Sequence, residues 1–80
     1  MYAIELAAEF AQQIESLHPK RYRQISLRIF ALQTNPRPPE SIMLEPDRYL
    51  VRVGSYQIAY RIDDTERRIR VLLLEEHEEE

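Results

Sequence analysis

The sequence has 80 residues, of which 44% are hydrophobic and 31% are charged, and it contains no cysteine. This composition is typical of a globular protein, and a chain of this length forms one domain with a thin core. The lack of cysteine excludes disulfides, thiol nucleophiles and thiolate metal sites. No apolar run approaches the ~20 residues of a membrane span, and no secretion leader opens the sequence. We therefore expect a cytoplasmic protein without membrane contact.

The net charge of −3 is unevenly distributed along the chain. Residues 1–74 carry 11 lysines and arginines against 9 acidic residues, whereas residues 75–80 carry five glutamates. We therefore expect one domain over residues 1–74 and an acidic tail over residues 75–80. A tail that leaves near a basic sheet face would compete with nucleic acid for that face. The alternative is a solvated tail that only aids solubility.

In the first half of the chain, the hydrophobic period changes from that of a strand to that of a helix. Alternation over residues 2–6 predicts a short strand. The period then becomes that of a helix of about three turns that begins at Ala7, with an apolar stripe formed by Phe10, Ile14 and Leu17. The residue before a proline avoids the α conformation, so His18 ends this helix as a loop residue. Pro19 suits the first turn of the next helix.

The second predicted helix runs from Pro19 to about Gln33, and its core stripe is Tyr22, Ile25, Ile29 and Leu32. Leu27 and Phe30 lie off this stripe, so the helix is apolar on a second side. We expect that side either to be clamped between two surfaces or to contact a partner. The proline-rich segment 35–39 is a stiff linker rather than a domain boundary, because neither flank is long enough to fold alone.

Three antiparallel strands are predicted between residues 49 and 74. Gly54, the only glycine, begins a two-residue turn that pairs Val53 with Tyr56 and turns the apolar face, tyrosines included, to the core. A four-residue turn at 63–66 then sets Arg61 opposite Arg68. Like charges so placed are mildly destabilising, which favours an anionic partner over a merely solvated face. The open face carries Leu50, Arg52, Gln57, Ala59, Arg61, Arg68, Arg70, Leu72 and Leu74.

The segment Tyr49-Leu-Val-Arg-Val-Gly-Ser-Tyr-Gln-Ile-Ala-Tyr-Arg-Ile-Asp-Asp resembles the RelE/ParE toxin signature. That signature reads aromatic-x-x-basic-Val-Gly-x-Tyr-Arg-aliphatic-x-Tyr, then an acidic turn and a final strand. The order of elements is similar over nearly the whole chain. The resemblance implies an α+β fold in which a short N-terminal strand, two helices and a three-stranded antiparallel meander form one sheet.

The same resemblance implies the toxin component of a bacterial toxin–antitoxin module, held inactive by an antitoxin that wraps it. RelE-like members cleave mRNA in the ribosomal A site, and ParE-like members act on DNA gyrase. The signature does not separate these two branches.

The resemblance assigns two catalytic candidates, Arg52 and His77. Arg52 matches a basic family position, Leu50 and Gln57 replace two others, and His77 falls near the basic position that ends the last strand. The family's terminal tyrosine has no counterpart. RNA cleavage without a metal needs a base, an acid and cations, and losing one charge stabiliser costs ~10²–10³ in rate. We therefore expect weak or no ribonuclease activity, with an active ribosome-dependent mRNA endonuclease or a ParE-like gyrase inhibitor as the alternatives.

The candidate binding residues form two sets, each with a plainer interpretation as surface. Nucleic acid or a partner would bind Arg52, Gln57, Arg61, Arg68 and Arg70, although alternation alone places polar residues on a solvated strand face. An antitoxin would contact Leu27, Phe30, Leu50, Leu72 and Leu74. His77 is also explained as a simple tail residue. We expect no cofactor and no metal, because His77 and the glutamates lack ligand spacing. The oligomeric state is left open.

Overall fold

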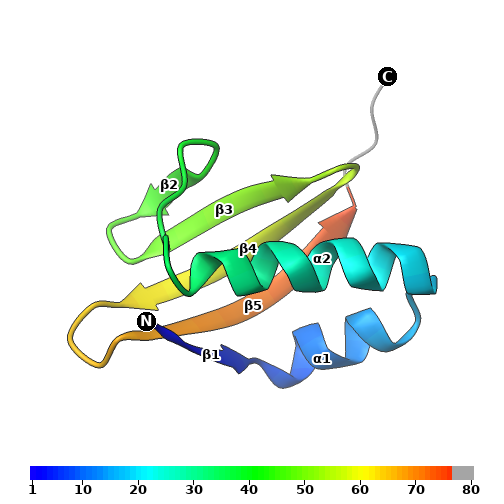
Figure 1. Cartoon of the computed structure of the whole chain (residues 1–80), viewed down its shortest axis with the longest axis horizontal. Coiled ribbons are helices and arrows are strands. Elements are labelled where there is room, and N and C mark those ends of the chain that lie inside the picture. Colours follow the sequence, from blue (N-terminus) through cyan, green and yellow to red (C-terminus); the bar gives the residue numbers. More distant parts are fainter. Residues whose placement is uncertain (77–80) are drawn as a thin grey trace.

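A five-stranded sheet carries both helices on one of its faces (Figure 1). The computed structural model describes residues 1–76. Along the chain the elements are β1 (Ala3–Leu6), α1 (Ala8–Glu15), α2 (Pro19–Leu32), β2 (Ile42–Glu45), β3 (Arg48–Val53), β4 (Tyr56–Asp63) and β5 (Arg68–Glu76). The strand order is β1-β5-β4-β3-β2, with β1 parallel to β5 and the other neighbours antiparallel. The predicted α+β class is confirmed.

Both helices lie where the hydrophobic period predicts them. Phe10 of α1 is fully buried, although α1 has eight residues rather than the three turns expected. His18 caps α2, because its Nδ1 accepts a hydrogen bond from the backbone N–H of Lys20 at 3.3 Å and leaves Pro19 in the first turn. The prediction for Tyr22 is wrong, since 47% of that residue is exposed.

The first hairpin has the predicted register. Gly54 has a φ of 61°, a conformation that favours glycine. Val53 pairs with Tyr56, and Tyr49 pairs with Tyr60. The resulting core lies between the helices and the sheet, and it consists of Phe10, Ile25, Ile29, Leu32, Tyr49, Val51, Ile58, Tyr60, Ile62, Ile69, Val71 and Leu74.

The second hairpin departs from the predicted register in two ways. Its turn is displaced by one residue, so that Arg61 lies opposite Arg70 instead of Arg68. A bulge then leaves Leu72 between the pairs of Tyr60 with Val71 and Ala59 with Leu73. Because one extra residue reverses the alternation of faces, Leu74 turns into the core and is only 6% exposed. Leu74 was predicted on the open face, and that prediction is wrong.

Two segments extend the sheet beyond the predicted meander. β2, which pairs with β3, was missed because its Ile-Met-Leu run does not alternate. β5 continues through Glu75 and Glu76, two residues past the expected end of the domain. His77 and the rest of the acidic tail lie outside the described residues, so the predictions made for them are not tested. No helix within residues 1–76 is long and apolar enough to cross a membrane.

The side chain of Gln13 joins α1 to the end of β5. Its amide nitrogen donates to the carbonyl of Leu74 at 2.7 Å, and its amide oxygen accepts from the N–H of Leu74 at 2.8 Å. β1 pairs with β5 only as far as Val71. Gln13 therefore supplies the hydrogen bonds that a neighbouring strand would otherwise make at Leu74.

The linker 35–39 is fixed to the sheet through Arg37. The guanidinium of Arg37 pairs with Asp64 in the β4–β5 turn, with Nη2 and Oδ2 2.8 Å apart. Its Nε donates to the hydroxyl of Tyr49 at 3.0 Å, and the guanidinium lies 5.3 Å from the centre of that ring. Tyr2 donates to the same carboxylate at 2.6 Å. The cluster thereby ties the linker, the start of β1 and the β4–β5 turn together.

We predict a pH-dependent effect of replacing Asp64 with Asn. The hydrogen bonds from Arg37 and then from Tyr2 lower the pKa of Asp64 below its ordinary value of 3.8. A carboxylate whose pKa is lowered by folding stabilises the native state while it is ionised, and this contribution is lost as the pH falls through the lowered pKa. Thermal unfolding of Asp64→Asn should therefore show a lower Tm than wild type at neutral pH and no difference well below pH 3.8. Glu66→Gln in the same turn is the control, and a deficit independent of pH would contradict the prediction.

Candidate partner and anion interface on the open sheet face

The sheet face opposite the helices presents three rows of side chains that cross β3, β4 and β5. The register of these strands defines each row. We call them the turn row (Arg52, Gln57, Glu75), the apolar row (Leu50, Ala59, Leu73) and the arginine row (Arg48, Arg61, Arg70). The apolar row is thus flanked on one side by the turn row, near the β3–β4 turn, and on the other side by the arginine row.

The arginine row continues across the whole sheet and ends in a carboxylate on each side. Glu45 of β2 is the pairing partner of Arg48, and Glu5 of β1 is the pairing partner of Arg70. Arg70 forms an ion pair with Glu5. Arg61 forms one with Asp47, with Nε and Oδ2 3.2 Å apart. These pairs are about half exposed, so each contributes little to stability.

Arg48 stands apart from its two neighbours in the row. Its Nε is buried and has no hydrogen-bond partner within residues 1–76, and no ion pair joins its side chain to Glu45 or to another carboxylate of that range. A buried donor without a partner costs about 1–3 kcal/mol, and the adjacent cation of Arg61 adds repulsion. Of the three side chains in the arginine row, Arg48 is therefore the one that is least favourable for the stability of the fold.

A groove of about 450 Å³ opens beside the arginine row. It combines two arginines of the row with aliphatic side chains and two carboxylates, and its lining is Ala7, Glu9, Leu44, Arg48, Ala59, Arg70, Leu72, Leu73 and Glu75. Leu44 comes from β2 and Leu72 is the bulge residue of β5. The missed strand and the missed bulge thus both contribute to this groove.

The structure separates the predicted binding residues instead of bringing them into one site. Arg52 lies in the turn row beside Gln57, and Arg61 and Arg70 lie in the arginine row. The two rows lie four positions apart along β3, or about 13 Å. Arg68 lies beyond both rows, where it pairs with Asp63 at the turn end of β5. His77, the second catalytic candidate, is outside the described residues.

Sequence reasoning missed Arg48 and Glu75. The predicted register of the first hairpin already places Arg48 opposite Arg61, so that signal was available. Glu75 was assigned to the tail, and only its place in β5 shows that a carboxylate lies next to Gln57. The turn row therefore holds one cation, one amide and one carboxylate, which is a poor environment for a phosphate.

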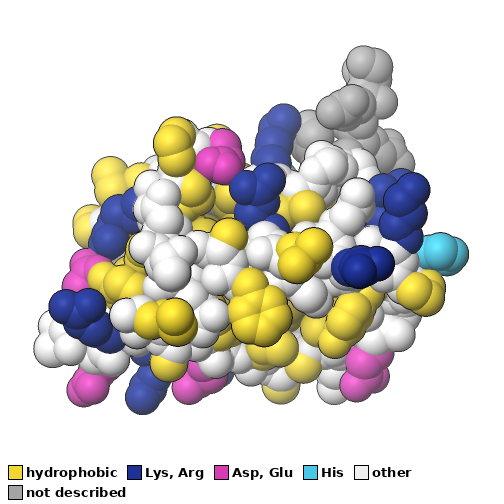
Figure 2. Space-filling model, viewed as in Figure 1, with side chains coloured by type: hydrophobic (Ala, Val, Ile, Leu, Met, Phe, Trp, Pro, Cys, Tyr) yellow, Lys and Arg dark blue, Asp and Glu magenta, His cyan; other side chains and the backbone are white. Residues whose placement is uncertain are grey.

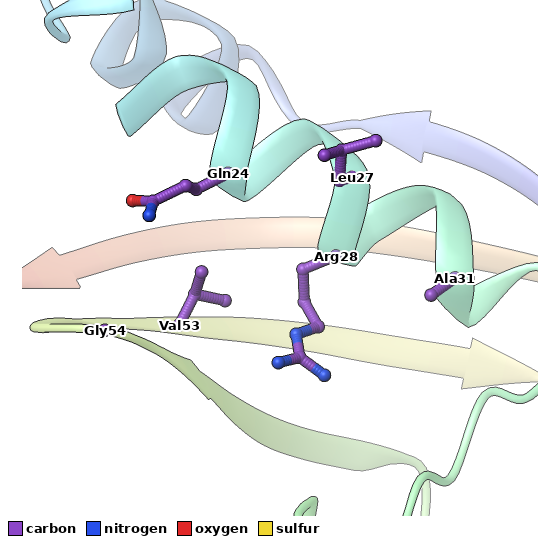
Figure 3. Close-up of a pocket in the computed structure, with 6 residues that line it drawn as sticks. All are labelled: Gln24, Leu27, Arg28, Ala31, Val53 and Gly54. Atoms are coloured by element: carbon purple, nitrogen blue, oxygen red, sulfur yellow. The ribbon is translucent and has the colours of Figure 1, made fainter. Parts of the chain in front are cut away.

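The helix side presents a second apolar surface. Figure 2 shows hydrophobic side chains gathered over the helices, and Leu27 and Phe30 are 62% and 65% exposed. A groove of about 420 Å³ separates α2 from the β3–β4 turn, and Arg28 extends from α2 toward the strands beside it (Figure 3). Arg28 is held by Glu40 at 2.9 Å. The predicted second apolar side of α2 is thus exposed in the chain alone.

Replacing Arg48 with Met should stabilise the protein. The substitution keeps an apolar stem of similar length and removes both the unpaired Nε–H and one of three adjacent cations. We expect the free energy of unfolding to rise by about 1 kcal/mol in urea or thermal unfolding. Arg68→Met is the matched control, with an expected change within about 0.5 kcal/mol. A clear loss of stability in Arg48→Met would contradict the assignment of an unpaired Nε–H at Arg48.

Comparison with known proteins identifies the fold. No protein family model matches the chain, and no curated protein matches its sequence. The isolated E. coli RelE toxin superposes with a TM-score of 0.88 at 16% identity, over 100% of this chain and 88% of that one. An archaeal RelE–RelB complex from Pyrococcus horikoshii OT3 gives 0.85 at 21% identity, over 99% and 98% of the two chains.

A third solved structure is the toxin–antitoxin complex RelBE2 from Mycobacterium tuberculosis, with a TM-score of 0.82 at 20% identity over 95% of this chain and 98% of that one. The likeness extends over nearly the full length in all three comparisons. The fold expected from the hairpin signature is therefore confirmed, with β2 as an added strand. This chain has the fold of the RelE toxins.

Proposed function

We propose that this protein is the cytoplasmic toxin component of a toxin–antitoxin pair, which binds an antitoxin and has weak or no ribonuclease activity. The observation that carries the proposal is the full-length RelE fold, combined with two uncovered apolar surfaces. Two of the similar structures are described as complexes of such a toxin with its antitoxin. Fold alone does not determine function, so the surfaces have to support the assignment.

The open sheet face has the character of a protein-binding surface. Ile42 and Leu44 of β2 are each more than half exposed, and Leu50 and Leu72 are half-buried beside them. A contiguous apolar strip flanked by charged rows is typical of a partner site. The exposed Leu27 and Phe30 lie on the helix side, across the sheet from this strip. A partner that covers both surfaces has to wrap around the domain.

The composition of the turn row supports the proposal that ribonuclease activity is weak or absent. Arg52 is the residue there that matches a basic family position, and it is exposed. Gln57 carries no charge, and Glu75 would repel a phosphate next to it. Each missing charge stabiliser lowers the rate by ~10²–10³. Use of the open face for ribosome-bound mRNA, with His77 as an acid, is the competing function.

Expression of the chain in bacteria tests the proposal. We expect it to form a stable complex with the product of the neighbouring reading frame, and we expect mRNA cleavage at least ~10²-fold below that of E. coli RelE expressed in parallel. Cleavage would be measured by mapping mRNA 5′ ends after induction. Growth arrest with efficient cleavage would establish an active endonuclease, and arrest with gyrase inhibition would establish a ParE-like activity. Failure to form any complex would reject antitoxin binding.

Charge substitutions on the two apolar surfaces test whether the antitoxin wraps around the domain and covers both of them. Leu50→Lys on the sheet face and Leu27→Lys on α2 should each weaken the complex at least ~10-fold, because each places a charge in an apolar contact. Glu66→Lys in the β4–β5 turn is the matched control and should leave the affinity unchanged. Titration calorimetry measures all three variants. If only one leucine variant loses affinity, the partner occupies one surface and does not wrap.

A further inference from the structure

The backbone of β1 is hydrogen-bonded to the sheet on one side only. β1 is the edge strand next to β5 (Figure 1). The N–H groups of Ala3 and Ala7 donate to the carbonyls of Arg67 and Val71, each at 2.9 Å. Because a strand directs the backbone groups of alternate residues to alternate sides, Glu5 also bonds to β5. The N–H and C=O groups of the residues between these three point away from the sheet.

The first of the outward-facing residues is already paired. The N–H of Tyr2 donates to the backbone carbonyl of Gln33 at 2.9 Å, and the side-chain amide of Gln33 donates to the carbonyl of Tyr2 at 3.3 Å. Gln33, the residue that caps the end of α2, thus takes the place of a neighbouring strand at Tyr2. Within residues 1–76, no hydrogen bond continues this pattern at Ile4 and Leu6.

An apolar groove of about 330 Å³ opens beside Ile4 and Leu6, and none of its lining residues is charged. Phe10 and Ile25, which belong to the core, contribute to its lining. Leu6 and Phe30 also line it and are 42% and 65% exposed. The edge of β1 therefore offers free backbone donors and acceptors next to an apolar groove. These are the two features that the addition of a β-strand requires.

A second copy of this chain fits the edge poorly. If two copies of β1 pair antiparallel around Glu5, Ile4 of each copy meets Leu6 of the other, and the two Glu5 carboxylates lie directly opposite each other, which is destabilising. Pairing around Ile4 requires the backbone groups of Tyr2, which the end of α2 already binds. Pairing around Leu6 requires Ala8, which is in α1. The edge is thus suited to a strand of different sequence.

The opposite edge of the sheet is less suited to an added strand. An irregularity between Met43 and Glu45 interrupts the four residues of β2, and Pro46, which has no N–H to donate, follows them. Bulges and prolines hinder the pairing of an edge strand with a further strand. A partner that wraps from the open sheet face to the exposed side of α2 has to cross one edge of the sheet. At β1 the crossing segment gains backbone hydrogen bonds.

We propose that β1 and the groove beside it bind an extended, apolar segment of the antitoxin, which adds a strand to the sheet. The segment exchanges hydrogen bonds with the backbone of Ile4 and Leu6, and it packs an apolar side chain into the groove next to Phe30. The proposal rests on the proposed function and deepens it, because it names the edge at which a wrapping partner passes from one face of the sheet to the other.

Hydrogen exchange of the full chain tests whether the edge is free. The amides of Ile4 and Leu6 should exchange at least ~10-fold faster than that of Glu5, because only the amide of Glu5 requires β1 to separate from β5 before it exchanges. Equal protection of the three amides would overturn the proposal, since the outward-facing donors would then already have partners.

A synthetic peptide of alternating leucine and threonine, flanked by lysines, serves as the probe for strand addition. Its binding should slow the exchange of Ile4 and Leu6 at least ~10-fold. A second peptide carries N-methyl groups on its central residues, so that it keeps the side chains and loses the backbone donors. This second peptide should bind at least ~10-fold more weakly, as the loss of two backbone hydrogen bonds implies. Equal affinity of the two peptides would overturn strand addition.

Two substitutions at one position separate the backbone from the side chain. Leu6→Ala shortens the side chain and keeps the N–H, whereas Leu6→Pro removes an N–H that points away from the sheet and leaves the bonds to β5 in place. Leu6→Pro should bind the unmethylated peptide at least ~5-fold more weakly than Leu6→Ala, and equal affinity would overturn the proposal. Leu44→Ala at the opposite edge is the control that should bind like wild type. Dispersed amide spectra show that each variant is folded, and the N-methylated peptide decides if Leu6→Pro is not.

The complex with the antitoxin separates failure of this inference from failure of the proposed function. In that complex, the amides of Ile4 and Leu6 should be protected. If the complex forms and both amides exchange as fast as in the free chain, the crossing at β1 is wrong and the toxin assignment stands. If the peptide protects both amides but no antitoxin complex forms, the edge binds strands of another kind of partner and the proposed function is rejected.

Discussion

The two-residue turn at Gly54 and Ser55 determines which side chains of the sheet meet the helices. Gly54 has a φ of 61°, and a Cβ there would meet nothing within 4 Å, so the constraint is in the backbone and not in the packing. From this turn outward, alternate residues of β3 and β4 face the core. A register shifted by one residue would expose Tyr60 and bury the arginines of these strands, at a cost of several kcal/mol per unpaired charge. The placement of the arginines of β3 and β4 on the open face depends on this turn.

The first hairpin was predictable because alternation, a glycine and a short turn all specify one register. The strand β5 was also predicted, but its register was not, since Val71 to Leu74 is an unbroken apolar run that is compatible with either face. The bulge at Leu72 lies in the pairing of β5 with β4, and this pairing is not a local feature of the sequence. β2 was missed because its Ile-Met-Leu run is also apolar without alternation. The candidate site followed from the sequence only in part: the family signature drew attention to Arg52, although the correctly predicted register also contained Arg48 opposite Arg61.

The open face shows how one architecture accommodates different chemistry at its two ends. Where the hairpin signature expects several cations, the turn row has Arg52, Gln57 and Glu75, whose charges largely offset one another. Three arginines lie instead toward the opposite end of the strands, where two of them are paired with carboxylates and Arg48 carries an unpaired donor. Natural proteins retain such unfavourable groups where function requires them.

The contact between Gln13 and Leu74 links the local opening of a helix to that of a strand. α1 has only eight residues and no side-chain hydrogen bond at its N-cap, so its ends should fray readily. When α1 opens, Leu74 loses both of the hydrogen bonds that Gln13 makes to its backbone. The amide proton of Leu74, although its side chain is in the core, should then exchange with solvent at the rate at which α1 opens. At Leu74, the protection of β5 against hydrogen exchange is therefore limited by the stability of α1, the shorter of the two helices.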